Sequence, residues 1–296
     1  MATALARLPD DRLAELLHGY HAAARAPRRR ALILAFSIAA LSLLAARVAE
    51  LDLPRLWEHS GAFFGYFDRI TTLESGAGRV WTDPAEWFWG WRKWGLLLLD
   101  TLLIAYVGTA LGTLGGFLLS FCTASNLATN RWLRGTARRF LELCRTVPDI
   151  VFALIFVIAF GLGPVPGVLA IAIHSMGTLG KLFSEVAENI DMKPVEGASA
   201  AGASWLAMLR FAVLPQVLPN YASYTLLRFE INVRQASVLG FVGAGGIGQD
   251  LIEAIRKFYY NDVAAILLLI ILTVMLIDLG TERLRHRLIG AMESRA

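Results

Sequence analysis

The sequence is short of charge and of cysteine, and each shortage removes a class of protein. Only 18% of the 296 residues are charged and 56% are hydrophobic, and the mean hydropathy is +0.54. A soluble domain of this length needs more polar surface than that. The two cysteines, Cys122 and Cys144, suggest no disulfide framework, and the five histidines are too scattered to form a metal site. We therefore interpret the chain as an all-α integral membrane protein built as one bundle.

Nucleotide-binding signatures are absent or weak. No GxxxxGK[ST] motif occurs, so we do not expect the chain to bind ATP through a P-loop. Gly243, Gly245 and Gly248 fit the pattern G-x-G-x-x-G, and Asp262 follows near the distance of a ribose-binding acid. That pattern requires a βαβ unit, whereas the flanking segments here have the length of membrane helices. We expect no cofactor and no metal on this chain.

Apolar runs recur along the chain, and crossing a bilayer takes about 20 residues. The obvious spans are 31–49, 95–123, 147–162, 165–183 and 263–279. Arginines gather before the first span, in the loop 124–139 and in the tail. Because basic loops stay in the cytoplasm, we expect this loop and both chain ends there. Two cytoplasmic ends require an even number of crossings, so a sixth must lie between residues 219 and 262.

These features divide the chain into four parts. Within the first part, residues 10–26 predict a short amphipathic cytoplasmic helix rather than a signal peptide. The parts are a cytoplasmic segment 1–30, a first span with an extracytoplasmic stretch 31–93, a transmembrane core 94–280 with a cytoplasmic loop 185–219, and a cytoplasmic tail 281–296.

The extracytoplasmic stretch is rich in tryptophan: six of the eight tryptophans fall between Trp57 and Trp94. Tryptophan prefers the membrane–water boundary, where its ring is buried and its N–H stays wet. The stretch is therefore an interfacial segment leading into the next span, or a docking surface for an extracytoplasmic partner.

The sixth crossing carries charges, since residues 220–242 are the only candidate for it. A charge at bilayer depth must face protein or water. At helical spacing one stripe of this segment is polar, and we interpret it as lining a path for an anion, with hydrogen bonding to neighbouring helices as the alternative. The stripe consists of Tyr221, Thr225, Arg228, Asn232 and Gln235.

Glu230, Arg234 and Ser237 lie on nearly the opposite side of the same helix. Glu230 and Arg234 are four residues apart and can form an intramembrane ion pair. A helix with two polar faces leaves little surface for lipid, so it belongs at the centre of an assembly. The glycines that follow predict a helix break and close backbone approach, which suits a gate; they are Gly243, Gly245, Gly246 and Gly248.

His174 lies within the span 165–183, and its helix holds no carboxylate nearby. We interpret it as a hydrogen-bonded packing histidine; a proton relay or a substrate ligand is the alternative.

A cytoplasmic motif precedes the charged helix, in the segment "EGASAAGASWLAMLRFAVLPQVLP" at 196–219. Its order and spacing resemble the EAA loop of binding-protein-dependent ABC importer permeases, although Gly197 and Ala212 depart from the usual residues. The resemblance implies a coupling helix that inserts into an ATPase subunit. Small residues allow close approach, Trp205, Leu206 and Leu209 offer apolar anchors, and Pro215 and Pro219 are expected to end the segment and redirect the chain. The expected coupling residues are Glu196, Gly197, Ala198, Gly202, Trp205, Leu206 and Pro215.

The segment 223–248, together with "CRTVPDIVFALIFV" at 144–157, is similar to phosphonate importer permeases. The resemblance covers about 95–280. It implies a six-helix bundle of the type I ABC importer (MetI-like) kind, paired as a homodimer in the inner membrane. It further implies two cytoplasmic ATPases that hold ATP and Mg, an extracytoplasmic substrate-binding protein, and a phosphonate or related phosphorus oxyanion as cargo.

Three alternatives remain open. Another type I permease, for an amino acid or an osmolyte, would share the motif. A secondary transporter would need no partner and often shows paired internal repeats, none of which is evident. A membrane enzyme would need a convergent set of catalytic groups, and none with recognisable spacing occurs.

Overall fold

The computed structural model describes residues 30–73, 76, 78–128 and 130–293, and the expected helix 10–26 lies outside them. Every named element in this part of the chain is helical, apart from one isolated bridge between Thr72 and Arg79, which confirms the all-α prediction for it. The chain divides into two units, 1–66 and 67–296.

The first unit holds a helix at Arg30–Val48, which matches the expected first span. The short helix α2, Leu53–Glu58, follows, and its N-cap Asp52 accepts a hydrogen bond from Arg55 N at 3.0 Å. Helix α3, Ser60–Ile70, begins in this unit and ends in the second.

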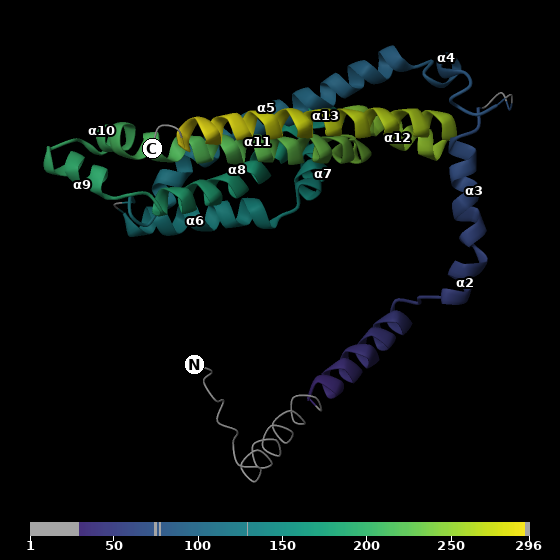
Figure 1. Cartoon of the computed structure of the whole chain (residues 1–296), viewed down its shortest axis with the longest axis horizontal. Helices are drawn as coiled ribbons and strands as arrows, with labels where there is room; N and C mark the ends of the chain where they lie inside the picture. The colour runs from purple at the N-terminus through teal and green to yellow at the C-terminus, as the bar shows by residue number, and fades with distance from the viewer. Residues whose placement is uncertain (1–29, 74–75, 77, 129, 294–296) are drawn as a thin grey trace, which may run out of the picture. The chain divides into compact units, whose positions relative to one another are not determined.

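The second unit is a bundle of long helices that run side by side (Figure 1): α5 at Trp91–Thr123, α8 at Pro164–Glu188, α11 at Leu214–Leu239 and α13 at Tyr260–Glu293. Helix α4, Pro84–Trp87, precedes them. Glycines bring α5 and α8 together: a Cβ on Gly112 would lie 2.6 Å from Ser175 Cβ, and one on Gly116 would lie 2.9 Å from Gly180 N. The small residues in the second span thus allow the backbones of these two helices to approach closely.

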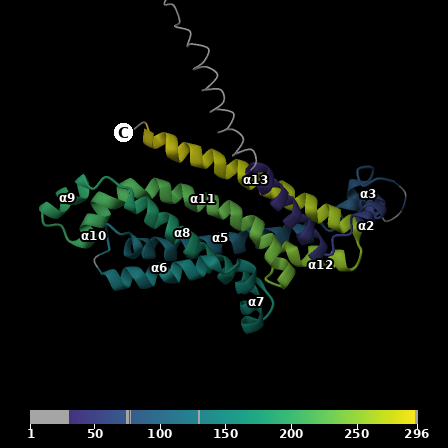
Figure 2. The ribbon, with the colours of Figure 1, turned by 90° about the horizontal axis from the view of Figure 1, so that it is seen from below.

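The structure differs from the prediction at the expected third span, 147–162. Helix α6, Arg131–Thr146, occupies much of what we expected to be a loop and packs along α8, and α7, Asp149–Phe160, leaves it at 88°. Figure 2 shows α7 turning away from the bundle. The break follows from Pro148, because a residue before proline avoids the helical region and Val147 is extended, with ψ 123°. Helix α7 has 12 residues, about 18 Å, so it cannot cross a bilayer alone.

The segment after α8 forms two short helices, α9 at Lys193–Ala200 and α10 at Trp205–Met208, and a π-turn at Leu209–Val213 leads into α11. The prolines do not redirect the chain, so that expectation was wrong. Pro215 lies in the first turn of α11, where a missing N–H costs little, and Pro219 lies inside the helix without ending it. The π-turn, in which Leu214 N donates to Leu209 O, joins α10 to α11 without a break.

Helix α11 ends through a 3₁₀ turn at Gly240–Val242, and after the glycines α12, Ile247–Arg256, leaves at 48°. By length and composition four described helices can each cross a membrane: Arg30–Val48, Trp91–Thr123, Pro164–Glu188 and Tyr260–Arg287. Up to six crossings result if each bent pair, α6 with α7 and the α10–α11 run with α12, is one span. Helices α9 and α10 lie at the end of the bundle where α13 finishes, and α4 and α12 lie at the other (Figures 1 and 2).

Candidate functional site

The segment expected to couple to a partner projects from one end of the bundle. Glu196, Gly197, Gly202 and Pro215 are exposed and Ala198 is half-buried. Gly202 has φ +78°, a left-handed conformation that favours glycine and reverses the chain between α9 and α10. Among the apolar anchors, Leu206 is 71% exposed and Trp205 is 41% exposed. The segment therefore presents small and apolar residues outward.

This segment is attached firmly to the bundle. Val195 and Leu209 are buried in a core cluster with Phe183 and Val213, so Leu209 is not the outward anchor that we expected. Leu209 points inward because it lies in the π-turn. The regular spacing of an α-helix does not predict this direction. Trp205 Nε1 donates to Leu127 O at 3.3 Å, which ties α10 to the end of α5. A force applied to α9 or α10 can therefore reach the bundle.

The polar stripe of α11 meets α5 and α8 in a buried junction centred on Ser175. Ser175 Oγ accepts from Arg228 Nε at 3.1 Å and from Asn232 Nδ2 at 2.8 Å. Asn232 Nδ2 also donates to Thr109 Oγ1 at 2.7 Å. Arg228 is 7% exposed and Asn232 is fully buried. Three helices are thus held together by hydrogen bonds that an apolar environment makes costly to break.

The rest of the stripe has mixed surroundings. Tyr221 is buried; its hydroxyl donates to Phe183 O at 2.8 Å, and its ring stacks on the Phe183 ring. Gln235 Oε1 accepts from Arg228 Nη2 at 3.4 Å. Thr225 is half-buried, and its hydroxyl donates to Tyr221 O in its own helix. Within one chain, Tyr221, Arg228 and Asn232 therefore make the hydrogen bonds to neighbouring helices that the alternative interpretation expects.

The charges on the other side of α11 form a three-residue cluster. Arg234 pairs with Glu230 and, at 2.7 Å, with Asp278 of α13. Asp278 was not foreseen, although an acid inside the last span was visible in the sequence as an isolated charge. The cluster joins α11 to α13 and places two carboxylates around one guanidinium.

The break between α6 and α7 brings an acid, Asp149, close to Arg228. His174 Nδ1 hydrogen-bonds Val147 O at 3.1 Å, as expected of a packing histidine. Two residues further, Asp149 lies near enough to interact electrostatically with both Arg228 and His174. Asp149 Oδ2 is buried and has no hydrogen-bond partner among the described residues. An acid at a helix start beside a proline was the available signal, but its spacing offers no reason to place it beside Arg228.

The glycine cluster lets four segments meet at the other end of α11. Gly243, Gly245 and Gly246 have positive φ, and Gly163 N donates to Gly243 O at 3.0 Å. A Cβ on Gly248 would lie 2.0 Å from Ser237 O, so α11 and α12 touch through backbone. Thr101 of α5 caps α12, because its Oγ1 accepts from Ile247 N at 2.9 Å. The expected helix break and close approach are both present.

The same end of the bundle carries Trp87, Trp89 and Trp94, beside α12 and α13. Trp89 Nε1 donates to Asp262 Oδ1 at 2.8 Å, and the Trp89 ring remains 65% exposed. Lys93 pairs with Asp250 at 2.7 Å, and a hydrogen bond from Lys257 to Glu253 raises the pKa of Lys257. No group of three potential metal ligands occurs among the described residues.

A family model described as "Binding-protein-dependent transport system inner membrane component" matches residues 112–292. The chain is 42% identical over 227 residues to the phosphite transport system permease protein PtxC of Stutzerimonas stutzeri, covering 75% of this chain and 82% of that protein. It is 52% identical over 121 residues to the cryptic phosphonate transport system permease protein PhnE2 of Escherichia coli (strain K12), covering 41% of this chain and 99% of that protein.

Among solved structures, an inward-facing form of the MetNI methionine ABC transporter is similar, with a TM-score of 0.57 and 20% identity. The match covers 66% of this chain and 95% of that chain. At this identity the likeness concerns the fold alone, and it agrees with the expected MetI-like bundle.

Proposed function

Because this chain belongs to the family of binding-protein-dependent transport system inner membrane components, we propose that it is the membrane subunit of an ATP-driven importer of phosphonate or a related phosphorus oxyanion. As a member of that family it is a multi-pass inner-membrane protein. The observation that carries the cargo proposal is the 42% identity with a phosphite permease along most of both chains. The phosphonate permease, 52% identical in its matched part, supports the same class of cargo.

The proposed assembly has two copies of this chain, two cytoplasmic ATPases that bind ATP and Mg, and an extracytoplasmic binding protein. Both chain ends are cytoplasmic in this proposal. Its support is that α9 and α10 lie where α13 finishes, so one end of the bundle carries both the coupling segment and the end of the last span. The tryptophans at the other end are a surface for the binding protein.

In this mechanism the coupling segment converts ATPase closure into helix movement. Glu196, Gly197 and Gly202 are exposed for contact with the ATPase, and Leu206 supplies the apolar anchor. Trp205 carries the displacement to the end of α5 through its bond to Leu127. The glycines 243–248 form the outer gate, where α11, α12 and the α7–α8 turn are in backbone contact.

Arg228 supplies positive potential to the path. A phosphorus oxyanion in a low-dielectric passage has a high electrostatic barrier, which a fixed guanidinium lowers. Ser175 and Asn232 hold the helix junction, and Thr225 and Gln235 are the stripe residues with accessible surface in the single chain. The cargo must not be held tightly, because conduction needs release.

The proposal is tested with the permease reconstituted into liposomes with its ATPases. Uptake of phosphite and of methylphosphonate is measured in the presence of binding proteins loaded with each, and a methionine-loaded binding protein is the comparison. We expect ATP-dependent uptake of a phosphorus oxyanion and none of methionine. Uptake of methionine or of an osmolyte instead would replace the cargo assignment, and uptake without ATP would favour a secondary transporter.

A further inference from the structure

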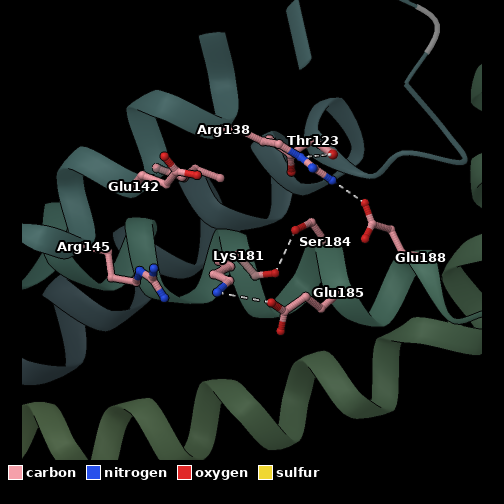
Figure 3. A pocket seen from close by; sticks show the side chains of 9 residues that line it. Thr123, Arg138, Glu142, Arg145, Lys181, Ser184, Glu185 and Glu188 are labelled. Carbon is pink, nitrogen blue, oxygen red and sulfur yellow. Dashed lines mark hydrogen bonds and ion pairs between the residues drawn. The ribbon is translucent and has the colours of Figure 1, made fainter. Parts of the chain in front are cut away.

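A cavity of about 190 Å³ lies between α6 and α8, on the half of α8 that leads into α9. Three cationic side chains line it, Arg138 and Arg145 from α6 and Lys181 from α8 (Figure 3). Figure 3 shows Arg145 and Lys181 on the same side of the cavity, with Arg138 across from them. The cavity is open to the surface of the chain and is distinct from the buried junction at Ser175.

The acids around the cavity leave one cation uncompensated. Glu188 pairs with Arg138 at 2.5 Å and Glu185 with Lys181 at 3.4 Å. Glu142 is engaged by Arg139, which does not line the cavity. Arg145 forms no ion pair with any described residue. The three cations and three carboxylates that line the cavity sum to zero, but Arg139 holds Glu142 from outside it, so Arg145 is left without a carboxylate partner in the cavity.

Further arginines of α6 lie beside the cavity and give its surroundings a positive charge. At about 100° per residue, the four residues Arg131, Arg134, Arg138 and Arg145 fall within about 60° of one another around α6. Arg131 and Arg134, like Arg145, form no ion pair within the described part of the chain. A row of arginines that ends at a cavity attracts anions toward it.

The position of the cavity fits a route from the membrane interior toward the cytoplasm. On α8, Lys181 follows Ser175, the partner of Arg228, by six residues, or about 9 Å of helix. Glu188 is the last residue of α8, five residues before α9 begins. Its carboxylate accepts a hydrogen bond from Ser125 N at 2.7 Å. Measured along the axis of α8, a ligand in the cavity would therefore lie between the level of Arg228 and that of the coupling segment.

We infer that this cavity is an inner binding station for a phosphorus oxyanion, in which Arg145 and Lys181 bind the phosphoryl oxygens. The inference rests on the proposed function, because it assigns the inner half of the path that the importer requires. Guanidinium and ammonium groups suit this ligand class through charge-assisted hydrogen bonds. Arg138 is the edge of the site and remains committed to Glu188.

The free anion is favoured over a lipid headgroup by the geometry of α6. The exposed apolar side chains of this helix, Trp132, Phe140 and Leu143, lie on the side away from the arginine row at helical spacing. A lipid would approach along that apolar side. The cavity instead opens between two helices.

The test measures equilibrium binding of radiolabelled inorganic phosphate to the purified permease–ATPase complex in detergent, with ADP filling the nucleotide sites. Removing one charge-assisted bond is expected to weaken binding about tenfold or more in Arg145→Gln and in Lys181→Gln. Arg131→Gln is the matched control, because Arg131 is an equally unpaired arginine of the same helix but lies about 21 Å of helix from Arg145, beyond the screening length of about 10 Å. Its affinity should stay within about twofold of wild type.

Wild-type affinity in both cavity variants, shown by gel filtration to remain assembled, would overturn the inference, as would absence of phosphate binding to the wild type. A second arm adds phosphatidylglycerol nanodiscs. Loss of phosphate binding there would identify a lipid headgroup as the ligand and overturn the assignment to cargo. Stimulation of wild-type ATPase activity by an oxyanion-loaded binding protein is measured in parallel, so failure of the proposed function is recognised separately.

Discussion

Replacing Ser175 with alanine tests the buried junction that holds Arg228. The Ser175 hydroxyl accepts from the Arg228 guanidinium at 3.1 Å and from the Asn232 amide at 2.8 Å, and alanine leaves both donors without that acceptor. A hydrogen bond to a charged group contributes about 1.5–3 kcal/mol and a neutral one about 1 kcal/mol. Since Asn232 keeps Thr109 and Arg228 keeps Gln235, we expect a loss of about 2–4 kcal/mol.

The measurement is the unfolding midpoint of the purified complex, which such a loss lowers by roughly 5–15 °C. Thr178→Val is the matched control, because Thr178 lies on the same helix and its hydroxyl donates only to His174 O in that helix. We expect the control to shift the midpoint by much less. Equal midpoints for Ser175→Ala and the control would refute the reasoning that the junction stabilises the three helices.

Three further outcomes are expected. Gly248→Ala should reduce the yield of assembled complex, since its Cβ would lie 2.0 Å from Ser237 O and must push α11 and α12 apart; a normal yield on gel filtration would contradict the backbone contact. Arg234→Gln should destabilise the complex by about 1 kcal/mol by leaving facing carboxylates unpaired, and Asp278→Asn in the same chain should restore the midpoint; absence of rescue would remove the cluster from the stability of the bundle. Gly202→Val strains a φ of +78° by about 1–2 kcal/mol in an exposed turn, so ATP hydrolysed per cargo transported should rise while assembly stays intact; an unchanged ratio would move the coupling contact elsewhere.

Apolar length was enough to place four of the spans, because a run that must bury its backbone in lipid has no other structure available. The close packing of α5 on α8 and the break after α11 were also predictable, since glycine has few uses inside a membrane helix. These features depend on local composition, which a single sequence contains.

The failures came from features that depend on tertiary partners. We expected a loop at 124–139, but most of it forms the helix α6, which ends with its C-cap at Val147, before Pro148. Its packing on α8, a tertiary contact, is what makes this segment helical. Leu209 faces inward because a π-turn shifts its register. Pro219 lies inside a helix that the buried residues Val217 and Tyr221, two positions to either side, hold in the bundle. The partners of the charged residues, Ser175 and Asp278, come from other helices, so no spacing within α11 could reveal them.

The most direct test of the central claim is oxyanion uptake by proteoliposomes that contain Arg228→Leu, with Arg228→Lys as the variant that keeps the charge. If this buried guanidinium lowers the barrier for an anion, the leucine variant loses most ATP-dependent uptake of phosphite or methylphosphonate, while its ATPase subunits still copurify and the lysine variant keeps a measurable rate. Uptake by the leucine variant at the wild-type rate, from a complex with the same subunit composition, would contradict the claim.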